Sequence, residues 1–293
     1  MGGAVAKAVV DGVLTGGVYA LMAAGLTLIF GVMDIINIAQ GILVVLGAYL
    51  SYVLSQDLGI GLFLGLLITI PSLFVIGVAV EWAFMRRLQE RERTALSILV
   101  TYGVAIVIEG ILELIFGPNY VQLRAWYVNQ SFHVLGFYLP YIYVFGFALA
   151  VFLLGVLYLI LYRSRFGRSV RASLQDRAAA RLVGVNVERV STITFGIGIA
   201  VTAAGGMVFG ATNAFNANSG YDLISRLLTI VILGGLGSIG GALGAAVFMT
   251  VIEGLVAVLW SPVWATLVFY AALVLVLVIK PVGIFGQRAA RAQ

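Results

Sequence analysis

The 293-residue chain is 62% hydrophobic and only 10% charged, whereas a soluble domain carries roughly 25% charged residues. So few charged side chains cannot cover a water-exposed surface, and we expect an all-α polytopic transmembrane protein with one domain over residues 1–293. The absence of cysteine and the single histidine, His133, exclude disulfides, thiolate chemistry and histidine metal clusters within the chain. The net charge of +5 does not indicate nucleic-acid binding, because the arginines lie in short patches between apolar runs.

Apolar runs recur along most of the chain, and a membrane span needs about 20 such residues. Candidate spans are residues 8–32, 36–56, 60–85, 95–117, 139–162, 191–215, 239–260 and 263–280. Residues 223–236 form a further apolar stretch that is short enough for a half-helix or a re-entrant segment. The sequence therefore predicts eight or nine membrane crossings.

The basic residues predict the orientation of these spans. Fourteen of the 17 lie in three segments: 86–93, 163–190 and the C-terminal end from Lys280. Short loops rich in arginine and lysine stay in the cytoplasm, so we place these segments there and the 118–138 loop outside. Three full spans before residue 86 put the N-terminus outside. If the 36–56 span is broken and returns to its own side, the N-terminus is inside.

Polar residues interrupt the apolar segment 31–49. Asp34, Asn37 and Gln40 recur every three residues, so they share one face if the segment is helical. Polar side chains at membrane depth face other protein or water rather than lipid, which favours a functional role. The alternative is that Asp34 and Asn37 only cap the start of a helix.

Charged residues that fall inside the predicted apolar segments include Glu81, Glu109, Glu113, Arg226 and Glu253. A charge at the bilayer centre costs about 2.5–3.5 kcal/mol on insertion scales, so each needs a partner or a water-filled cavity. Glu109 and Glu113 lie one helical turn apart. Two carboxylates this close repel each other unless a proton or cation resides between them, which keeps ion coupling open as an alternative function.

The arginine-rich loop 163–190 has an organised pattern. Alanines and leucines alternate with charged residues up to Gly184, which supplies a helix stop. The pattern predicts a short amphipathic helix, the kind of element that docks into the groove of a partner protein. The alternative is a loop that only fixes the membrane topology.

Six glycines lie between residues 234 and 244. Each costs up to ~1 kcal/mol relative to alanine in a regular helix. Either the backbone leaves helical geometry near Gly237-Ser238, giving a broken helix along a solute path, or the glycines allow helices to pack closely. The spacings that suit close packing are Gly237/Gly241, Gly240/Gly244, Gly12/Gly16 and Gly206/Gly210.

Several catalytic arrangements are missing. The only lysines are Lys7 and Lys280, so no P-loop lysine is present. His133 lies in the predicted outer loop, far from Ser238 in the sequence, so a serine–histidine pair is not expected. We therefore expect a protein that is not an enzyme and that needs no cofactor or metal.

Taken together, these segments resemble the permease subunits of ABC importers for branched-chain amino acids. The first motif is Ile36-Asn37-Ile38-Ala39-Gln40-Gly41-Ile42 followed by Leu46-Gly47-Ala48-Tyr49. The second is the loop with Gly167-Arg168, Arg171-Ala172, Asp176, Ala179-Ala180 and Leu182-Val183-Gly184-Val185-Asn186. The others are Leu233-Gly234-Gly235-Leu236-Gly237-Ser238-Ile239 and the C-terminal Pro281-Val282-Gly283-Ile284-Phe285-Gly286. Gln40 and Ile42 depart from the family, which usually has His and Glu at these positions.

The resemblance implies a bacterial inner-membrane permease domain that forms half of a translocation path. Its expected partners are two ATPase subunits, a second homologous permease (a heterodimer or a homodimer) and a periplasmic substrate-binding protein. The implied coupling residues are Arg171, Asp176, Ala179, Ala180 and Gly184. The implied path residues are Asn37, Gln40, Gly234, Gly235, Gly237 and Ser238. Urea or short amides stay open as substrates, and an ion-coupled carrier or a non-transporting scaffold as the function.

Overall fold

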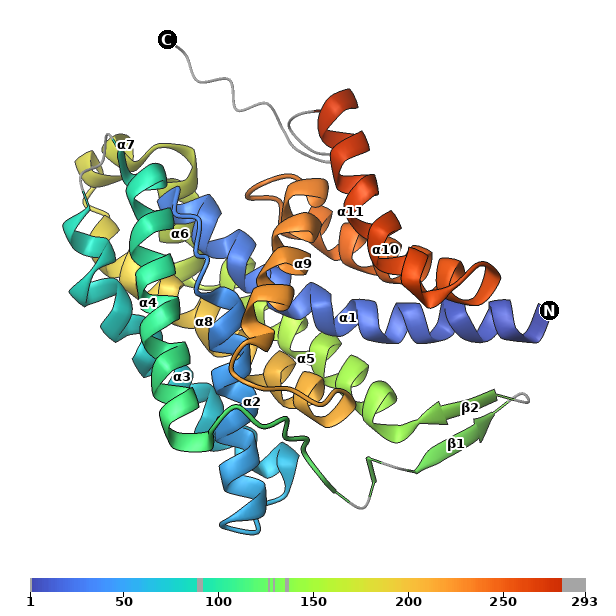
Figure 1. Cartoon of the computed structure of the whole chain (residues 1–293). Coiled ribbons are helices and arrows are strands. Elements are labelled where there is room, and N and C mark those ends of the chain that lie inside the picture. Colours follow the sequence, from blue (N-terminus) through green and yellow to red (C-terminus); the bar gives the residue numbers. More distant parts are fainter. Residues whose placement is uncertain (1, 89–91, 126, 129, 135–136, 281–293) are drawn as a thin grey trace.

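The computed structural model describes residues 2–88, 92–125, 127–128, 130–134 and 137–280. Helices dominate it (Figure 1). In the described part, seven helices are long and apolar enough to cross a membrane. They are α1 (Gly2–Met33), α3 (Leu62–Ala83, continued by the 3-10 turn η1, Met85–Arg87), α4 (Arg93–Phe116), α5 (Tyr141–Arg163), α8 (Val187–Thr212), α10 (Ile239–Leu259) and α11 (Pro262–Ile279). The remaining helices are α2 (Gln40–Gln56), α6 (Arg165–Gln175), α7 (Arg177–Leu182) and α9 (Ser219–Gly234).

The expectation of an all-α membrane protein is confirmed, and each predicted span coincides with a helix. The number of crossings stays a prediction, because α2 has 17 residues and α9 has 16. The C-terminal motif from Pro281 to Gly286 lies outside the described residues. Between α4 and α5, strands β1 (Ser131–Val134) and β2 (Phe137–Pro140) pair as an antiparallel hairpin, with Ser131 opposite Pro140.

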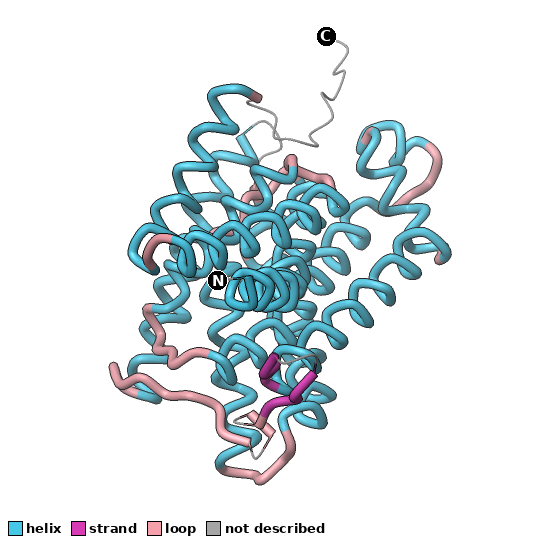
Figure 2. The backbone as a smooth tube through the Cα atoms, turned by 90° about the vertical axis from the view of Figure 1, so that its right-hand side faces the viewer, coloured by secondary structure: helices cyan, strands magenta, loops and turns pink. Residues whose placement is uncertain are grey.

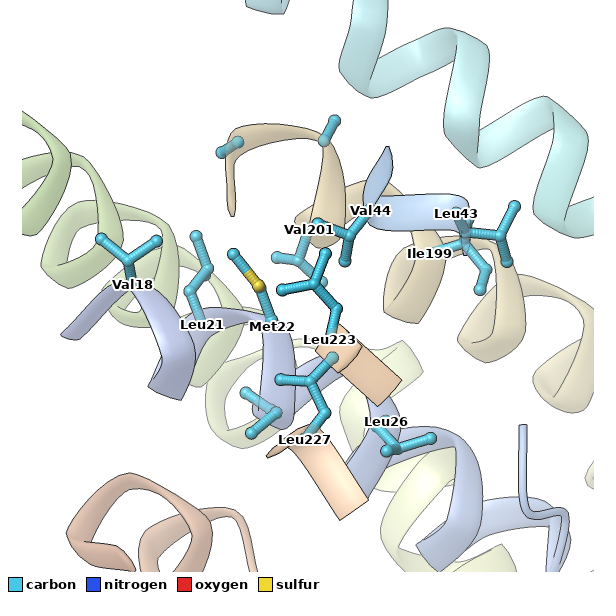
Figure 3. Packing of buried hydrophobic residues seen from close by; sticks show 14 of the residues in the cluster. Val18, Leu21, Met22, Leu26, Leu43, Val44, Ile199, Val201, Leu223 and Leu227 are labelled. Atoms are coloured by element: carbon cyan, nitrogen blue, oxygen red, sulfur yellow. The ribbon is translucent and has the colours of Figure 1, made fainter. Parts of the chain in front are cut away.

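The core is built around α1, which appears nearly end-on among the other helices in Figure 2. Val18, Leu21, Met22 and Leu26 of α1 are buried with residues of α2, α8 and α9, including Leu223 (Figure 3). Burial of this kind removes α1 and α8 from lipid, whereas α11 leaves most of its apolar side chains exposed. Helices α1 and α8 are therefore the most buried of the seven long apolar helices, and α11 is the least buried.

Small residues allow α1 to approach its neighbours closely. A Cβ added to Gly12 would lie 2.7 Å from the Cα of Val251, and one added to Gly16 would lie 2.7 Å from the Cα of Val247. The hydroxyl of Thr250 donates a 2.7 Å hydrogen bond to the carbonyl of Gly12 across the same contact. The predicted close packing at Gly12 and Gly16 is confirmed, since only hydrogen fits between these backbones.

The glycine-rich segment is not one continuous helix. Helix α9 ends at Gly234, Gly235 and Gly237 have φ angles of 91° and 83°, and α10 begins at Ile239. Side chains strongly disfavour these φ angles, so glycine is required at the turn. The predicted break near Gly237-Ser238 is confirmed. The predicted packing pair Gly237/Gly241 is wrong, because the two residues do not share a helix.

The polar segment after α1 is also not helical. Residues 34–37 have no regular structure, and Asp34 has a φ of 54°. The expectation that Asp34, Asn37 and Gln40 share a helical face is therefore wrong, as only Gln40 lies in α2. The capping alternative fails too, because the N-cap of α2 is Ala39 and no side chain caps that end.

Candidate functional site

The first candidate site is the segment 165–184, which joins α5 to α8 and contains α6 and α7. It stands at one end of the molecule (Figure 1). Ser164 caps α6 by accepting a 2.9 Å hydrogen bond from the amide of Gly167. The chain leaves α7 through Gly184, whose φ of 84° confirms the predicted helix stop. The pattern of the loop predicted one short amphipathic helix, whereas the structure has two, α6 and α7.

Asp176 separates the two helices and caps the second. Its Oδ1 accepts hydrogen bonds from the amides of Ala178 at 2.8 Å and Ala179 at 3.0 Å. These amides have no partner within the helix, so an oxygen acceptor at this position stabilises the first turn. Asp176, which was predicted as a coupling residue, is therefore the N-cap of α7.

Asp176→Ala is expected to destabilise α7 by about 1 kcal/mol, because two amides lose their acceptor. Hydrogen exchange of the α7 amides should accelerate, while exchange in α6 stays unchanged. Asp176→Asn keeps the side-chain oxygen and serves as the control. Equal exchange in all three proteins would contradict the capping role.

The predicted coupling residues Arg171, Ala179 and Ala180 differ in burial and in contacts. The Arg171 guanidinium donates to the carbonyl of Leu161 and lies 5.3 Å above the ring of Tyr162, so it anchors α6 to the end of α5. Ala180 is 3% exposed, whereas Ala179 is exposed. Arg171 and Ala180 thus hold the segment together, and Ala179 contributes to its surface.

The most exposed apolar side chains of this segment belong to the quoted loop motif but were not among the predicted coupling residues. Leu182 is 89% exposed and Val183 is 78% exposed, next to Gly184. The signal that could have identified these side chains is the position of two apolar residues directly before Gly184, the predicted helix stop, in a loop that is otherwise rich in charge. Exposed aliphatic side chains at the tip of an amphipathic helix are suited to a partner's groove.

Arg177 joins the segment to two long helices. Its guanidinium donates to the carbonyls of Val32 at 3.4 Å and Met33 at 3.5 Å, at the end of α1. It also donates to the hydroxyl of Ser191 in α8 at 3.3 Å. Sequence spacing gave no sign of these contacts, because α1 lies more than 140 residues away. Arg177 therefore connects α7 to both α1 and α8 by hydrogen bonds.

The second candidate site is the non-helical segment 34–38. Ser97 and Thr101 of α4 accept hydrogen bonds from the amides of Ile36 at 3.2 Å and Ile38 at 3.1 Å. The hydroxyl of Thr94 donates to the carbonyl of Asp34 at 2.8 Å. These hydroxyls satisfy backbone groups that a helix would otherwise have paired, which makes a helix break tolerable at membrane depth.

Asn37 and Gln40 lie inside this site and are fully buried. The amide nitrogen of Asn37 donates to the Oε1 of Gln40 at 2.9 Å, and the Nε2 of Gln40 donates to the carbonyl of Gly198 in α8 at 3.4 Å. The two predicted path residues therefore contact each other, and Gln40 also contacts α8. Their place on a solute path stays a prediction.

The remaining predicted path residues, Gly234, Gly235, Gly237 and Ser238, form the turn between α9 and α10. The hydroxyl of Ser238 caps α10 by accepting from the amide of Gly241 at 3.1 Å. Gly237 faces Gly31 near the end of α1. This group thus lies beside the end of α1 that also contacts α7, whereas Gln40 contacts Gly198 in the middle of α8.

The acidic residues of the spans all accept hydrogen bonds. Glu109 accepts from the Tyr221 hydroxyl at 2.6 Å, and Glu113 from the Asn218 amide at 2.8 Å. Both oxygens of Glu253 accept from the Nη1 of Arg226, at 2.8 and 2.9 Å. Glu81 is 2% exposed and accepts from the Thr192 hydroxyl at 2.6 Å. These pairs connect α4 to α9, α9 to α10, and α3 to α8.

Comparison with known proteins places these features in a family. The sequence profile described as "Branched-chain amino acid transport system / permease component" matches residues 8–277. The high-affinity branched-chain amino acid transport system permease protein LivH of Escherichia coli K12 is 29% identical, with 94% of each chain covered. The corresponding permease BraD of Pseudomonas aeruginosa is 26% identical over 95% of this chain and 94% of its own.

A more distant relative shares only part of the chain. The autoinducer 2 import system permease protein LsrC of Klebsiella pneumoniae is 35% identical over 46% of this chain and 41% of its own. No solved structure matches the sequence. Because the family profile covers almost the whole chain, the protein belongs to the branched-chain amino acid transport permease family and is a multi-pass membrane protein of transport.

Proposed function

We propose that the chain is the permease subunit of an ABC importer and forms half of a translocation path for branched-chain amino acids. The observation that carries the proposal is the segment 165–184. It presents Leu182 and Val183 to the surface and is bonded through Arg177 to α1 and α8. A subunit that uses another chain's ATP hydrolysis needs both a docking surface and a rigid connection to its spans.

The proposed arrangement puts the segment 165–184 and the C-terminus in the cytoplasm. Arginines concentrate in this segment and near η1, which favours that side. Two ATPase subunits would dock there, and a substrate-binding protein would deliver solute at the opposite face. A second permease, either a homologous chain or another copy of this one, would complete the path.

The proposed path is opened by movement of α2 against α8. In the present conformation Asn37 and Gln40 are enclosed, and Gln40 is bonded to the backbone of α8. A shift of α8 driven through Arg177 would break this bond and expose amide groups to a polar solute. The turn at Gly234, Gly235, Gly237 and Ser238 would form the inner part of the same path, because it neighbours the end of α1.

Uptake by the assembled transporter tests the proposal. Proteoliposomes with the partner ATPases and binding protein should accumulate labelled leucine, isoleucine or valine only when ATP is present, and should accumulate little urea or acetamide. The chain alone should hydrolyse no ATP. Uptake that survives ATP depletion but collapses with the proton gradient would favour an ion-coupled carrier instead.

A further inference from the structure

Helix α6 begins against the end of α5 and runs toward the centre of the molecule. A Cβ on Gly167 would stand inside van der Waals contact with the carbonyl oxygens of Ile160 and Leu161, so the first turn of α6 touches the last turns of α5. At the other end of α6, a methyl group of Leu174 lies 3.0 Å from the position of a Cβ on Gly31 in α1. Because α1 is largely buried and α5 largely exposed, α6 starts at the periphery of the protein and ends near its core.

The last turns of α5 present an aromatic and aliphatic surface to the outside. Tyr158 and Tyr162 are 58% and 55% exposed, and their rings stack with centroids 4.4 Å apart. Leu159 beside them is 56% exposed. Tyrosine is enriched where a membrane meets water, because its amphipathic ring sits at the level of the lipid headgroups. This end of α5 therefore has the side chains of a headgroup-level surface.

Three arginines adjoin this surface. Arg163 is the last residue of α5, Arg165 and Arg168 lie in the first turn of α6, and all three are exposed. None of them forms an ion pair with another described residue. Arg171, one turn further along α6, is instead bonded to the backbone of α5. Three positive charges are thus left without a negative partner in the described part of the chain.

The surroundings of these arginines decide which anion suits them. Arg165 and Arg168 stand one turn apart on α6, where like charges repel each other, so an anion between them is favourable. A soluble anion would gain nothing from the exposed tyrosines and leucine of α5. A phospholipid with a net negative charge matches both surfaces, since it carries a phosphate and apolar chains. Basic residues near an anionic bilayer surface gain about 1 kcal/mol each from this attraction.

We propose that Arg163, Arg165 and Arg168 bind the headgroup of an anionic phospholipid, whose acyl chains lie along the outer face of α5 beside Tyr158 and Leu159. Arginine suits this task, because its planar guanidinium can donate two parallel hydrogen bonds to a phosphate. A lipid bound here attaches the start of the segment 165–184 to the bilayer. The binding needs only this chain and lipid, so neither a solute nor the partner ATPases enter its test.

Native mass spectrometry of the purified full-length chain tests the proposal. The chain is released from detergent micelles that contain equal amounts of phosphatidylglycerol and phosphatidylcholine with the same acyl chains. Phosphatidylglycerol should be retained in preference. Arg165→Gln/Arg168→Gln should reduce that preference by about tenfold or more, because two attractive charges are lost. Arg165→Lys/Arg168→Lys should retain most of it, since both charges remain.

Arg181→Gln/Arg189→Gln is the matched control. It removes the same charge from exposed positions on α7 and α8, and it should leave the lipid preference unchanged. Equal retention of the two lipids by the unmodified protein would overturn the proposal. An equal loss in both glutamine variants would also overturn it, because net charge rather than this surface would then attract the lipid. Displacement of phosphatidylglycerol by inorganic phosphate would assign the arginines to a soluble anion instead.

Discussion

Gly184→Asp is expected to reduce ATP-driven uptake by about tenfold or more, as a loss of coupling free energy between two sites would. Gly184 has a φ of 84°, where a side chain is strained, and it directly follows Val183 at the exposed tip of α7. The new carboxylate would stand beside the proposed docking surface. Membrane insertion should be intact, since a Cβ at this position would meet no other atom within 4 Å.

Gly59→Asp separates the effect of location from the effect of strain. Gly59 also has a positive φ, 66°, and a Cβ there would likewise meet nothing within 4 Å. It lies between α2 and α3, at the far end of the molecule from α7 (Figure 1). Uptake and partner ATPase activity should stay normal in Gly59→Asp. Normal uptake in Gly184→Asp, or an equal loss in both variants, would count against the coupling role.

Gly25→Ala is expected to destabilise the chain by about 1–3 kcal/mol or more, as overpacking of a tight core does. A Cβ on Gly25 would lie far inside van der Waals contact with the carbonyl oxygen of Gly198, and a Cβ on Gly198 would lie 2.8 Å from the carbonyl oxygen of Gly25. Both obstacles are backbone atoms of long helices, so neither can rotate away. The thermal unfolding midpoint in detergent should fall.

Gly110→Ala is the matched control. Gly110 lies within α4, and a Cβ there would meet nothing within 4 Å. Alanine is favoured over glycine in a helix by up to ~1 kcal/mol, so this variant should be as stable as the parent or slightly more stable. Equal unfolding midpoints for the Gly25 and Gly110 variants would show that α1 and α8 separate readily.

Local patterns were sufficient to predict much of the fold. Runs of apolar residues predicted every long helix. A segment that crosses lipid must be apolar along its own length, so this signal does not depend on contacts with other segments. The amphipathic loop and Gly184 predicted α7 and its end, and the glycines near Gly237 predicted the break between α9 and α10. Each of these features is determined by residues that are close to one another in the sequence.

Contacts between distant segments could not be predicted in this way. The hydroxyls of Ser97 and Thr101 pair with backbone more than 60 residues earlier, so the spacing of Asp34, Asn37 and Gln40 suggested a helix that does not form. Arg177 donates a hydrogen bond to the carbonyl of Val32 in α1. No pattern in the sequence around Arg177 indicates this contact. Arg226 and Glu253 were each expected to need a partner, but their positions in the sequence did not indicate that they pair with each other.

The hydrogen bonds between α4 and the segment 34–38 have a consequence for protein engineering. Three hydroxyls of α4 recognise only the peptide groups of this segment, at Asp34, Ile36 and Ile38. Replacing the side chains of Ile36 or Ile38 leaves those peptide groups in place. The side chains next to Asn37 and Gln40 can therefore be replaced by other residue types while α4 keeps its attachment. On the proposed path, such replacements would change the contacts with the solute without removing the hydrogen bonds that hold the segment in place.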